Sequence, residues 1–311
     1  MLDQYRCEVE DTYAEAFRSL YAEFLITARD RKWLDHALHA ATGHASSTIM
    51  CDCEAGLDRY VGPGGDESFA TPDGRPGAIV QLHVPRFRKD RVPALEKALL
   101  ARVSQNVLTC PTTACFNTLD SEDYYRLGRK LAYFGDGHEF LDERFGRTMW
   151  VVPTMGGEFC IDRRFGYADG IMGGNLWFMG ETEGSAIEAA EKAAAAVEKT
   201  PGTITTFPGG VASSASKAGS KYPFLFASTF AEYCPTLKEK LGENSRVPDG
   251  VTSIQEIIIN GRSLEAVAAA TYAAMEACHD TPGLRKISAG NYNGRLGKSF
   301  IYLDRDKQAA A

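Results

Sequence analysis

Residues 254–261 read Ile-Gln-Glu-Ile-Ile-Ile-Asn-Gly, which places one carboxylate, Glu256, among four isoleucines. So many β-branched residues in so short a run predict a β-strand. A glutamate in such a strand either faces solvent or is partly desolvated. Desolvation would raise its pKa toward the range in which a carboxyl exchanges protons at neutral pH. A solvated or ion-paired strand glutamate is the commoner alternative for a glutamate taken at random.

The segments around this strand predict a unit that occurs twice in the chain. In the second half, strands at 175–179, 203–207, 254–259 and 284–288 alternate with helices at 185–199 and 264–278 in the order β-α-β-β-α-β. The first half has the same order, with strands expected at 23–27, 46–51, 78–84 and 106–110 and a helix after the first and the third. Pro-Asp-Gly precedes the third strand in both halves. We therefore expect an α+β fold of two duplicated ferredoxin-like lobes.

The segment between the two halves predicts an inserted sheet. Apolar residues alternate over 149–152 and 158–161, on either side of Pro153 and a Gly156-Gly157 turn, as in a β-hairpin. We expect three parts: a first lobe over residues 1–112, inserted hairpins and a connection over 113–173, and a second lobe over 174–311.

The composition is that of a soluble globular protein and excludes several functional classes. The 311 residues are 44% hydrophobic and 24% charged, which is enough to bury two cores. A net charge of −7 argues against a nucleic-acid surface, and no run of 18 apolar residues predicts a membrane span. The charged start of the chain lacks the apolar segment of a signal peptide, so we expect a cytoplasmic protein.

The cysteines and histidines do not predict a metal site. Cys51 and Cys53 are too close for a Cys-x-x-Cys pair, and no second pair follows at zinc spacing. Cys110 and Cys234 each precede Pro-Thr, but no histidine lies nearby in sequence to activate either thiol. Eight cysteines in a cytoplasmic chain are expected to be reduced thiols.

Two glycine-rich loops are candidates for ligand binding. The first contains Phe207-Pro208-Gly209-Gly210, Ser213, Lys217 and Lys221, and it offers amides, hydroxyls and cations to an anionic ligand. A mobile glycine-serine loop is an equally good interpretation of the same composition. No Gly-x-x-x-x-Gly-Lys-Ser/Thr or Gly-x-Gly-x-x-Gly motif supports nucleotide binding. The second loop follows the last strand and includes Gly290 and Asn291.

Nine segments, spread in order over nearly the whole chain, resemble one known family, the formylmethanofuran–tetrahydromethanopterin formyltransferases. They are Val9–Phe17, Thr71–Gly77, Phe134–Gly137, Gly173–Asn175, Phe207–Gly210, Ser214–Lys221, Tyr233–Thr236, Glu256–Gly261 and Lys286–Asn291.

The resemblance implies a two-lobed enzyme that moves a formyl group between the amine of a furan-type carrier and N5 of a tetrahydropterin. Its proposed proton-transfer glutamate falls on Glu256. The carrier and tetrahydromethanopterin would be co-substrates, with no permanently bound cofactor and no metal. The family implies a homodimer or homotetramer with the site at a subunit interface, and bacterial members bind hydrolase-complex subunits.

On loop chemistry, Gly209, Gly210, Gly290 and Asn291 are candidate donors to an oxyanion, and Lys217 and Lys221 are candidates for holding anionic groups of the substrates. A non-catalytic carrier-binding or scaffold subunit of a formyltransferase/hydrolase complex is the alternative. A pair of RNA-binding domains fails on net charge and on the lack of an aromatic-basic strand motif.

Overall fold

The computed structural model describes residues 6–310, which form two compact units. One unit comprises residues 19–170, and the other comprises residues 171–310 together with the described residues up to Arg18. The boundaries fall within two long strands, β2 (Tyr13–Thr27) and β10 (Phe165–Gly180). This division differs from the three parts expected from the sequence, because residues 113–170 belong with 19–112 and the start of the chain belongs with its end.

The 19–170 unit is built on an antiparallel sheet in the order β5-β2-β4-β3. Its elements follow as β2, α1 (Arg31–Thr42), β3 (Glu54–Val61), β4 (Gly77–Pro85), α2 (Arg91–Arg102) and β5 (Ala114–Asn117). Both helices pack on one face of the sheet, where Phe24 and Leu82 share a core with Leu34 and Leu99. The unit continues through β6 (Tyr124–Tyr125), α3 (Leu127–Ala132), β7 (Phe140–Arg144), β8 (Arg147–Thr154) and β9 (Gly157–Asp162).

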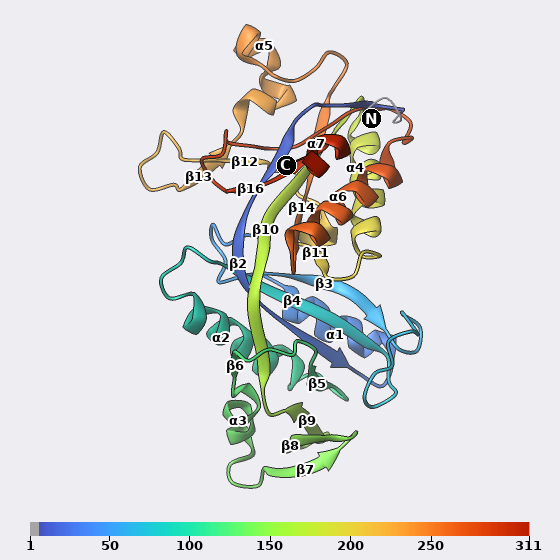
Figure 1. Ribbon diagram of the computed structural model, residues 1–311, viewed down its shortest axis with the longest axis vertical. Helices are drawn as coiled ribbons and strands as arrows, with labels where there is room; N and C mark the ends of the chain where they lie inside the picture. The colour runs from blue at the N-terminus through green and yellow to red at the C-terminus, as the bar shows by residue number, and fades with distance from the viewer. Residues whose placement is uncertain (1–5, 311) are drawn as a thin grey trace. The chain divides into compact units, whose positions relative to one another are not determined.

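The 171–310 unit has a sheet of the same kind, in the order β15-β10-β14-β11. Its elements are β10, α4 (Glu183–Val197), β11 (Thr203–Thr205), β14 (Ser253–Gly261), α6 (Leu264–Cys278) and β15 (Leu284–Ser288). The helices α4 and α6 lie side by side on one face of this sheet (Figure 1). Their alanines let them pack closely against Phe178 and Ile257. The unit also contains three short elements near the chain ends: β1 (Glu8–Val9), β16 (Ser299–Tyr302) and α7 (Arg305–Ala310).

A long segment between β11 and β14 covers the other face of the 171–310 sheet. It carries a hairpin of β12 (Ser216–Ala218) and β13 (Ala227–Thr229), several 3₁₀ turns and the short helix α5 (Lys238–Leu241). Phe230, Tyr233, Val247 and Val251 pack on Trp177 of β10. The segment therefore has a fixed place on the sheet face that is free of helices.

The α+β class is confirmed, and in the second half the predicted bounds of α6 and β15 match the structure. The hairpin at residues 149–161 is also confirmed as β8 and β9. Two of the strands predicted for the first half are absent from the structure at the predicted positions. Residues 46–51 form turns, and the strand lies at Glu54–Val61, whereas residues 106–110 end a helix that continues through a π-helical turn at Val103–Val107.

Within residues 6–310, no helix combines the length and the apolar character that a membrane span requires.

Candidate active site

Glu256 projects from β14 on the face of the sheet opposite the helices. Its neighbours Ile257 and Ile259 belong to the core under α4 and α6. Because side chains alternate along a strand, Glu256 points to the other face. Trp177 of β10, which pairs directly with Glu256, lies on that face among residues of the long covering segment.

Two side chains of the neighbouring strand hold the Glu256 carboxyl. The Asn175 Nδ2 and the Trp177 Nε1 each donate a hydrogen bond to Glu256 Oε1, both at 2.8 Å. Within the part of the chain that the structure describes, no group donates to Oε2. One oxygen of the carboxyl thus carries both hydrogen bonds, and the other carries none from the described residues.

Burial changes the acidity of this carboxyl. Glu256 is only 7% exposed, and the loss of hydration raises its pKa above the ordinary value for a glutamate. The hydrogen bonds from Trp177 and Asn175 act in the opposite direction but do not cancel the effect. A carboxyl with a raised pKa can both accept and donate a proton near neutral pH, which is the property of a general acid–base.

The covering segment is tied to Glu256 through its backbone. Ala212 and Glu256 exchange two N–H···O hydrogen bonds of 2.8 Å, so the segment runs antiparallel to β14 at Glu256. Aromatic rings line the space next to it. The centroid of the Trp177 ring lies 4.6 Å from that of Tyr233 and 5.7 Å from that of Phe230, both in edge-to-face contact. A flat, apolar part of a substrate fits such a wall.

The loop after β15 supports the same site from another side. The Gly290 N–H donates to Asn175 Oδ1 at 3.0 Å, which orients the amide that binds Glu256. A Cβ at position 290 would lie 2.7 Å from Asn175 Nδ2 and 2.8 Å from a ring carbon of Trp177, so only glycine fits. The Asn291 amide donates to Thr12 Oγ1 at 2.9 Å. Both predicted donors are therefore already engaged, and they position neighbouring groups rather than point at an open site.

Gly209 and Gly210 do not lie beside the Glu256 side chain. They form a 3₁₀ turn with Pro208, in which the Gly210 N–H donates to the Phe207 carbonyl. A Cβ on Gly210 would touch Thr205 and Ala194 of α4, which places this turn near the helix side of the sheet. Their expected role as oxyanion donors is thus not supported by the geometry.

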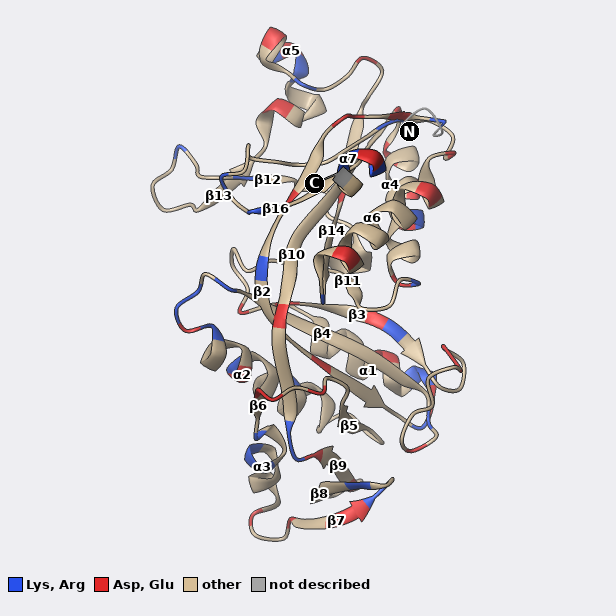
Figure 2. Ribbon diagram, in the orientation of Figure 1, with Lys and Arg blue, Asp and Glu red and all other residues tan. Residues whose placement is uncertain are grey.

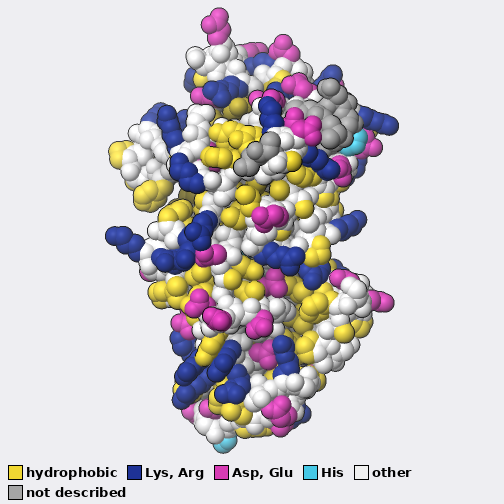
Figure 3. Space-filling view, in the orientation of Figure 1, with side chains coloured by type: hydrophobic (Ala, Val, Ile, Leu, Met, Phe, Trp, Pro, Cys, Tyr) yellow, Lys and Arg dark blue, Asp and Glu magenta, His cyan; other side chains and the backbone are white. Residues whose placement is uncertain are grey.

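Ser213, Lys217 and Lys221 lie on the covering segment. Ser213 is exposed and directly follows Ala212. Lys217 is on β12, and Lys221 lies past its end with its Nζ 5.1 Å from the centroid of the Tyr222 ring. Figure 2 shows these cations on the β12–β13 hairpin, and Figure 3 shows hydrophobic side chains beside basic ones there. The exposed apolar residues of the hairpin are Tyr222, Phe224, Leu225 and Phe226.

Two residues of this region, Glu15 and Tyr292, are not predicted from the sequence. Glu15 binds the backbone of the loop after β15, and Tyr292 of that loop stacks on Phe230. Glu15 falls in a segment that resembles the family, but nothing in its local pattern distinguishes it from other strand glutamates. Its partners lie more than 270 residues away in sequence.

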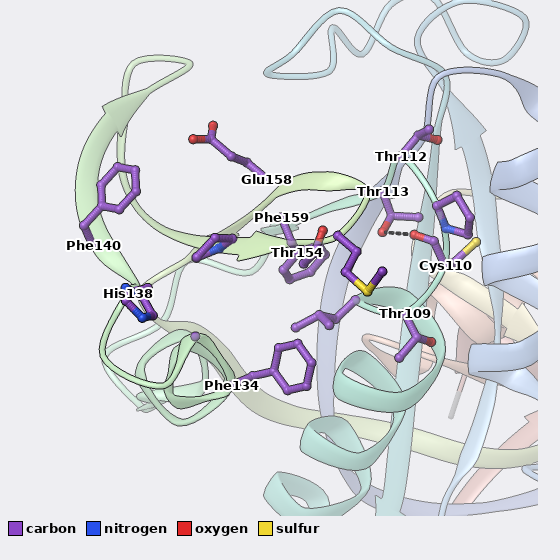
Figure 4. Close-up of a pocket in the computed structure, with 16 residues that line it drawn as sticks. Thr109, Cys110, Thr112, Thr113, Phe134, His138, Phe140, Thr154, Glu158 and Phe159 are labelled. Atoms are coloured by element: carbon purple, nitrogen blue, oxygen red, sulfur yellow. Dashed lines mark hydrogen bonds between the residues drawn. The ribbon is translucent and has the colours of Figure 1, made fainter.

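The 19–170 unit has a separate pocket of about 990 Å³ between residues 108–113 and the β8–β9 hairpin (Figure 4). Phe134, Phe140 and Phe159 make its lining largely apolar. Its one carboxylate, Glu158, is exposed and pairs with Arg144. This pocket lacks the buried, hydrogen-bonded carboxyl that distinguishes the Glu256 site. Nor do residues 6–310 contain a group of three His, Cys, Asp or Glu side chains placed to hold a metal ion.

Comparisons with known proteins agree over nearly the whole chain. The family described as formylmethanofuran-tetrahydromethanopterin formyltransferase matches residues 2–154, and its proximal lobe matches residues 157–305. A formylmethanofuran–tetrahydromethanopterin formyltransferase of Methanosarcina acetivorans is 46% identical over 94% of this chain and 95% of its own length. The corresponding protein of Archaeoglobus fulgidus is 44% identical over 96% of this chain and 97% of its own.

Two solved structures share the fold. The formyltransferase from Methanosarcina barkeri superposes with a TM-score of 0.89 at 44% identity, covering 96% of this chain and 97% of its own. A chain of the formyltransferase/hydrolase complex from Methylorubrum extorquens, solved with methylofuran, superposes with a TM-score of 0.86 at 38% identity, covering 96% of both chains. This chain therefore belongs to the formylmethanofuran–tetrahydromethanopterin formyltransferase family.

Proposed function

We propose that this chain transfers a formyl group between the amine of a furan-type carrier and N5 of tetrahydromethanopterin, and that Glu256 moves the proton. The observation that carries the proposal is the Glu256 carboxyl, which is buried and held through Oε1 by Asn175 and Trp177. Both carriers are co-substrates, and the reaction involves no permanently bound cofactor.

The transfer requires one proton to change nitrogen. N5 attacks the formyl carbon, a C–N bond forms, and the carbonyl electrons move to oxygen to give a tetrahedral oxyanion. Glu256 takes the proton from N5 and gives it to the carrier nitrogen. The oxyanion then re-forms the carbonyl as the second C–N bond breaks, and the carrier amine leaves. General acid–base catalysis of this kind contributes roughly 10²–10⁴-fold to the rate.

The covering segment supplies the groups that would hold the substrates. The aromatic rings beside Glu256 offer a surface for a pterin or furan ring. Ser213, Lys217 and Lys221 would bind anionic groups of the carrier or of the pterin tail, because cations and hydroxyls favour such groups. Gly290 acts on the site by orienting Asn175, and Asn291 ties the loop after β15 to Thr12.

The finer description of the fold is part of the same proposal. We infer that both units are ferredoxin-like lobes that arose by duplication. Each has the chain order β-α-β-β-α-β, and in each sheet the fourth strand pairs with the first, the first with the third and the third with the second. A homodimer or homotetramer, association with hydrolase-complex subunits and a cytoplasmic location stay predictions from the sequence.

The alternative of a non-catalytic scaffold subunit is less well supported. A scaffold would have no need of a desolvated carboxyl, which costs folding free energy. This chain has both Glu256 and two donors that orient it.

The test is an assay with formylated carrier and tetrahydromethanopterin, comparing wild type with Glu256→Gln. We expect turnover to fall at least tenfold, equivalent to about 1.4 kcal/mol of barrier, while circular dichroism shows an intact fold. Glu243→Gln, an exposed glutamate of the covering segment, is the matched control and should retain full turnover. Unchanged turnover in folded Glu256→Gln would remove Glu256 from the mechanism. A wild-type protein that transfers no formyl group from formylated methanofuran or from its bacterial analogue would refute the reaction.

A further inference from the structure

A second glutamate of the 171–310 unit, Glu15 on β2, has a very different environment from Glu256. Its carboxylate is 2% exposed and accepts four hydrogen bonds from backbone N–H groups of the loop after β15. Oε2 binds the N–H groups of Tyr292 at 2.7 Å and Gly294 at 2.9 Å. Oε1 binds those of Gly297 at 2.6 Å and Leu296. The loop is thus wrapped around one side chain.

The charge of Glu15 holds this arrangement together. Burial alone would raise the pKa of Glu15, but the four backbone donors outweigh it and lower the pKa below the ordinary value. The side chain is therefore an anion at neutral pH, enclosed by oriented amides as in an anion-binding nest. The loop backbone also packs tightly against β2 next to Glu15, since a Cβ on Gly297 would lie 1.9 Å from the Ala16 carbonyl oxygen.

The near end of the same loop forms part of the transfer site. Gly290 orients Asn175, which binds Glu256. Two residues further on, the Tyr292 ring stacks on Phe230, with centroids 6.4 Å apart and planes at 14°. Its hydroxyl donates to the Ser216 carbonyl at 2.6 Å. Tyr292 therefore joins the loop after β15 to the covering segment.

Tyr292 also lies within electrostatic range of Glu256. Its pKa is raised to about 12, first by burial and then by the charges of Glu256 and Glu15. The phenol is therefore neutral at physiological pH and keeps its hydroxyl as a donor. The stacking on Phe230 and the hydroxyl bond to Ser216 hold this side chain on the covering segment, within electrostatic range of the Glu256 carboxyl.

We propose that Glu15 is a positioning residue for formyl transfer: by folding residues 292–297 around its carboxylate, it sets Tyr292 and Gly290 in place around the Glu256 carboxyl. This inference rests on the proposed role of Glu256 and goes beyond it, because Glu15 contacts no reacting atom. It acts through two intermediaries, the Tyr292 cover and the Gly290–Asn175 hydrogen bond.

The first test is a double-mutant cycle. Glu15→Gln keeps the shape of the side chain but turns an NH₂ group toward two N–H donors, so it should release the loop. We expect kcat to fall about tenfold in Glu15→Gln and also in Tyr292→Ala. The double variant should be no slower than the slower single variant, because both changes remove the same cover. If the two losses multiply, Glu15 does not act through Tyr292 and the proposal is overturned.

The second test separates positioning from general damage to the fold. Release of the cover hydrates Glu256 and lowers its pKa, so the limb of the kcat–pH profile that Glu256 sets should move to lower pH in Glu15→Gln. A loss of folded enzyme would lower kcat by the same factor at every pH and leave the position of the limb unchanged. That outcome contradicts the proposal. Tyr292 is an ionisable group of this loop whose pKa is affected by Glu256. Tyr292→Phe keeps the ring and removes the phenol, so it shows how much of the shift comes from the phenol itself.

The third test needs no activity. Arg295 is exposed within the loop, so trypsin should cleave after it faster in Glu15→Gln than in wild type or in Glu243→Gln. If Glu15→Gln does not fold, amide hydrogen exchange in the wild type replaces this comparison. The proposal requires slow exchange of the N–H groups of Tyr292, Gly294 and Gly297, because these groups bind Glu15. Fast exchange there, or unchanged cleavage, overturns the proposal. Faster cleavage together with a wild type that lacks transfer activity would refute the proposed function and leave the role of Glu15 in the loop intact.

Discussion

The two units use equivalent strands in opposite ways on the sheet face that carries no helices. In the 171–310 unit, Trp177 lies five residues before the N-cap of the next helix and pairs with Glu256. In the 19–170 unit, Leu25 lies five residues before the corresponding cap and pairs with Ile79. Ile79 therefore occupies the place of Glu256.

The covers of these two positions differ as much as the residues themselves. Ile79 is 1% exposed and packs with Phe116, Met149 and Val151. These three residues belong to the regular strands β5 and β8. Glu256 lies under an irregular segment that also brings carbonyls, hydroxyls and cations. The comparison indicates that strand order alone does not create a site. A carboxyl is tolerated where the cover is irregular and polar and where the neighbouring strand supplies donors.

The largest expected effect is a loss of stability when a carboxyl is placed at Ile79 of the 19–170 unit, as at Glu256 of the 171–310 unit. Ile79→Glu would bury a carboxyl among apolar side chains without a donor, so the free energy of unfolding should fall by about 3 kcal/mol or more. The matched change Ile79→Val should cost about 1 kcal/mol. Urea unfolding of the two variants measures the difference. Equal losses would show that the apolar cover is no obstacle to a carboxyl.

A smaller effect is expected from disturbing the donors of Glu256. Gly290→Ala would push a methyl group against Asn175 and Trp177, so both hydrogen bonds to Oε1 should lengthen. We expect kcat to fall about tenfold, or about 1.4 kcal/mol of barrier. Gly184→Ala in α4 is the control, because the nearest atom to its Cβ would lie 3.8 Å away. Full activity in Gly290→Ala would show that the orientation of the carboxyl is not critical.

The smallest expected effect is the pH dependence of stability, which should have opposite signs for the two buried glutamates. The pKa of Glu256 is raised by burial, so the folded chain binds more protons than the unfolded chain between the ordinary and the raised value. The stability contribution of Glu256 therefore falls as pH rises through that window. The pKa of Glu15 is lowered by its backbone donors despite burial, so its contribution is lost as pH falls through the lowered value.

Urea unfolding between pH 3 and pH 8 checks these signs. Relative to wild type, Glu256→Gln should become more stable as pH rises, and Glu15→Gln should become less stable. The same trend in both variants would mean that at least one of the two carboxyls titrates in the opposite sense to its burial and hydrogen bonding.

The fold could be predicted where local pattern and packing agree. The helical spacing of α6 reveals its buried face, and the density of β-branched residues reveals the strand β14. Strand β3 was missed because it carries Asp58, a fully buried carboxylate paired with Arg59 and bonded to Gln81 of β4. A polar network across strands hides the apolar alternation that identifies a strand from sequence.

The site could be predicted only in part. The isoleucines around Glu256 leave two alternatives open, a solvated and a desolvated carboxyl. The strand order places β14 beside β10, and the structure places Asn175 and Trp177 of β10 on the carboxyl. The orientation of Glu256 depends on register, which a single residue of slip would reverse. Glu15 was missed because its partners are backbone amides, which leave no trace in the side-chain pattern.

The pairing of β1 with β15 and of β16 with β2 also has a consequence for biosynthesis. Residues 8–16 leave the ribosome early, but their partners follow only after more than 270 further residues, on the order of tens of seconds later. The 19–170 unit can assemble meanwhile, whereas the start of β2 waits without a partner. Until the loop after β15 arrives, Glu15 is a charge in an unpaired strand segment, and such charges oppose aggregation.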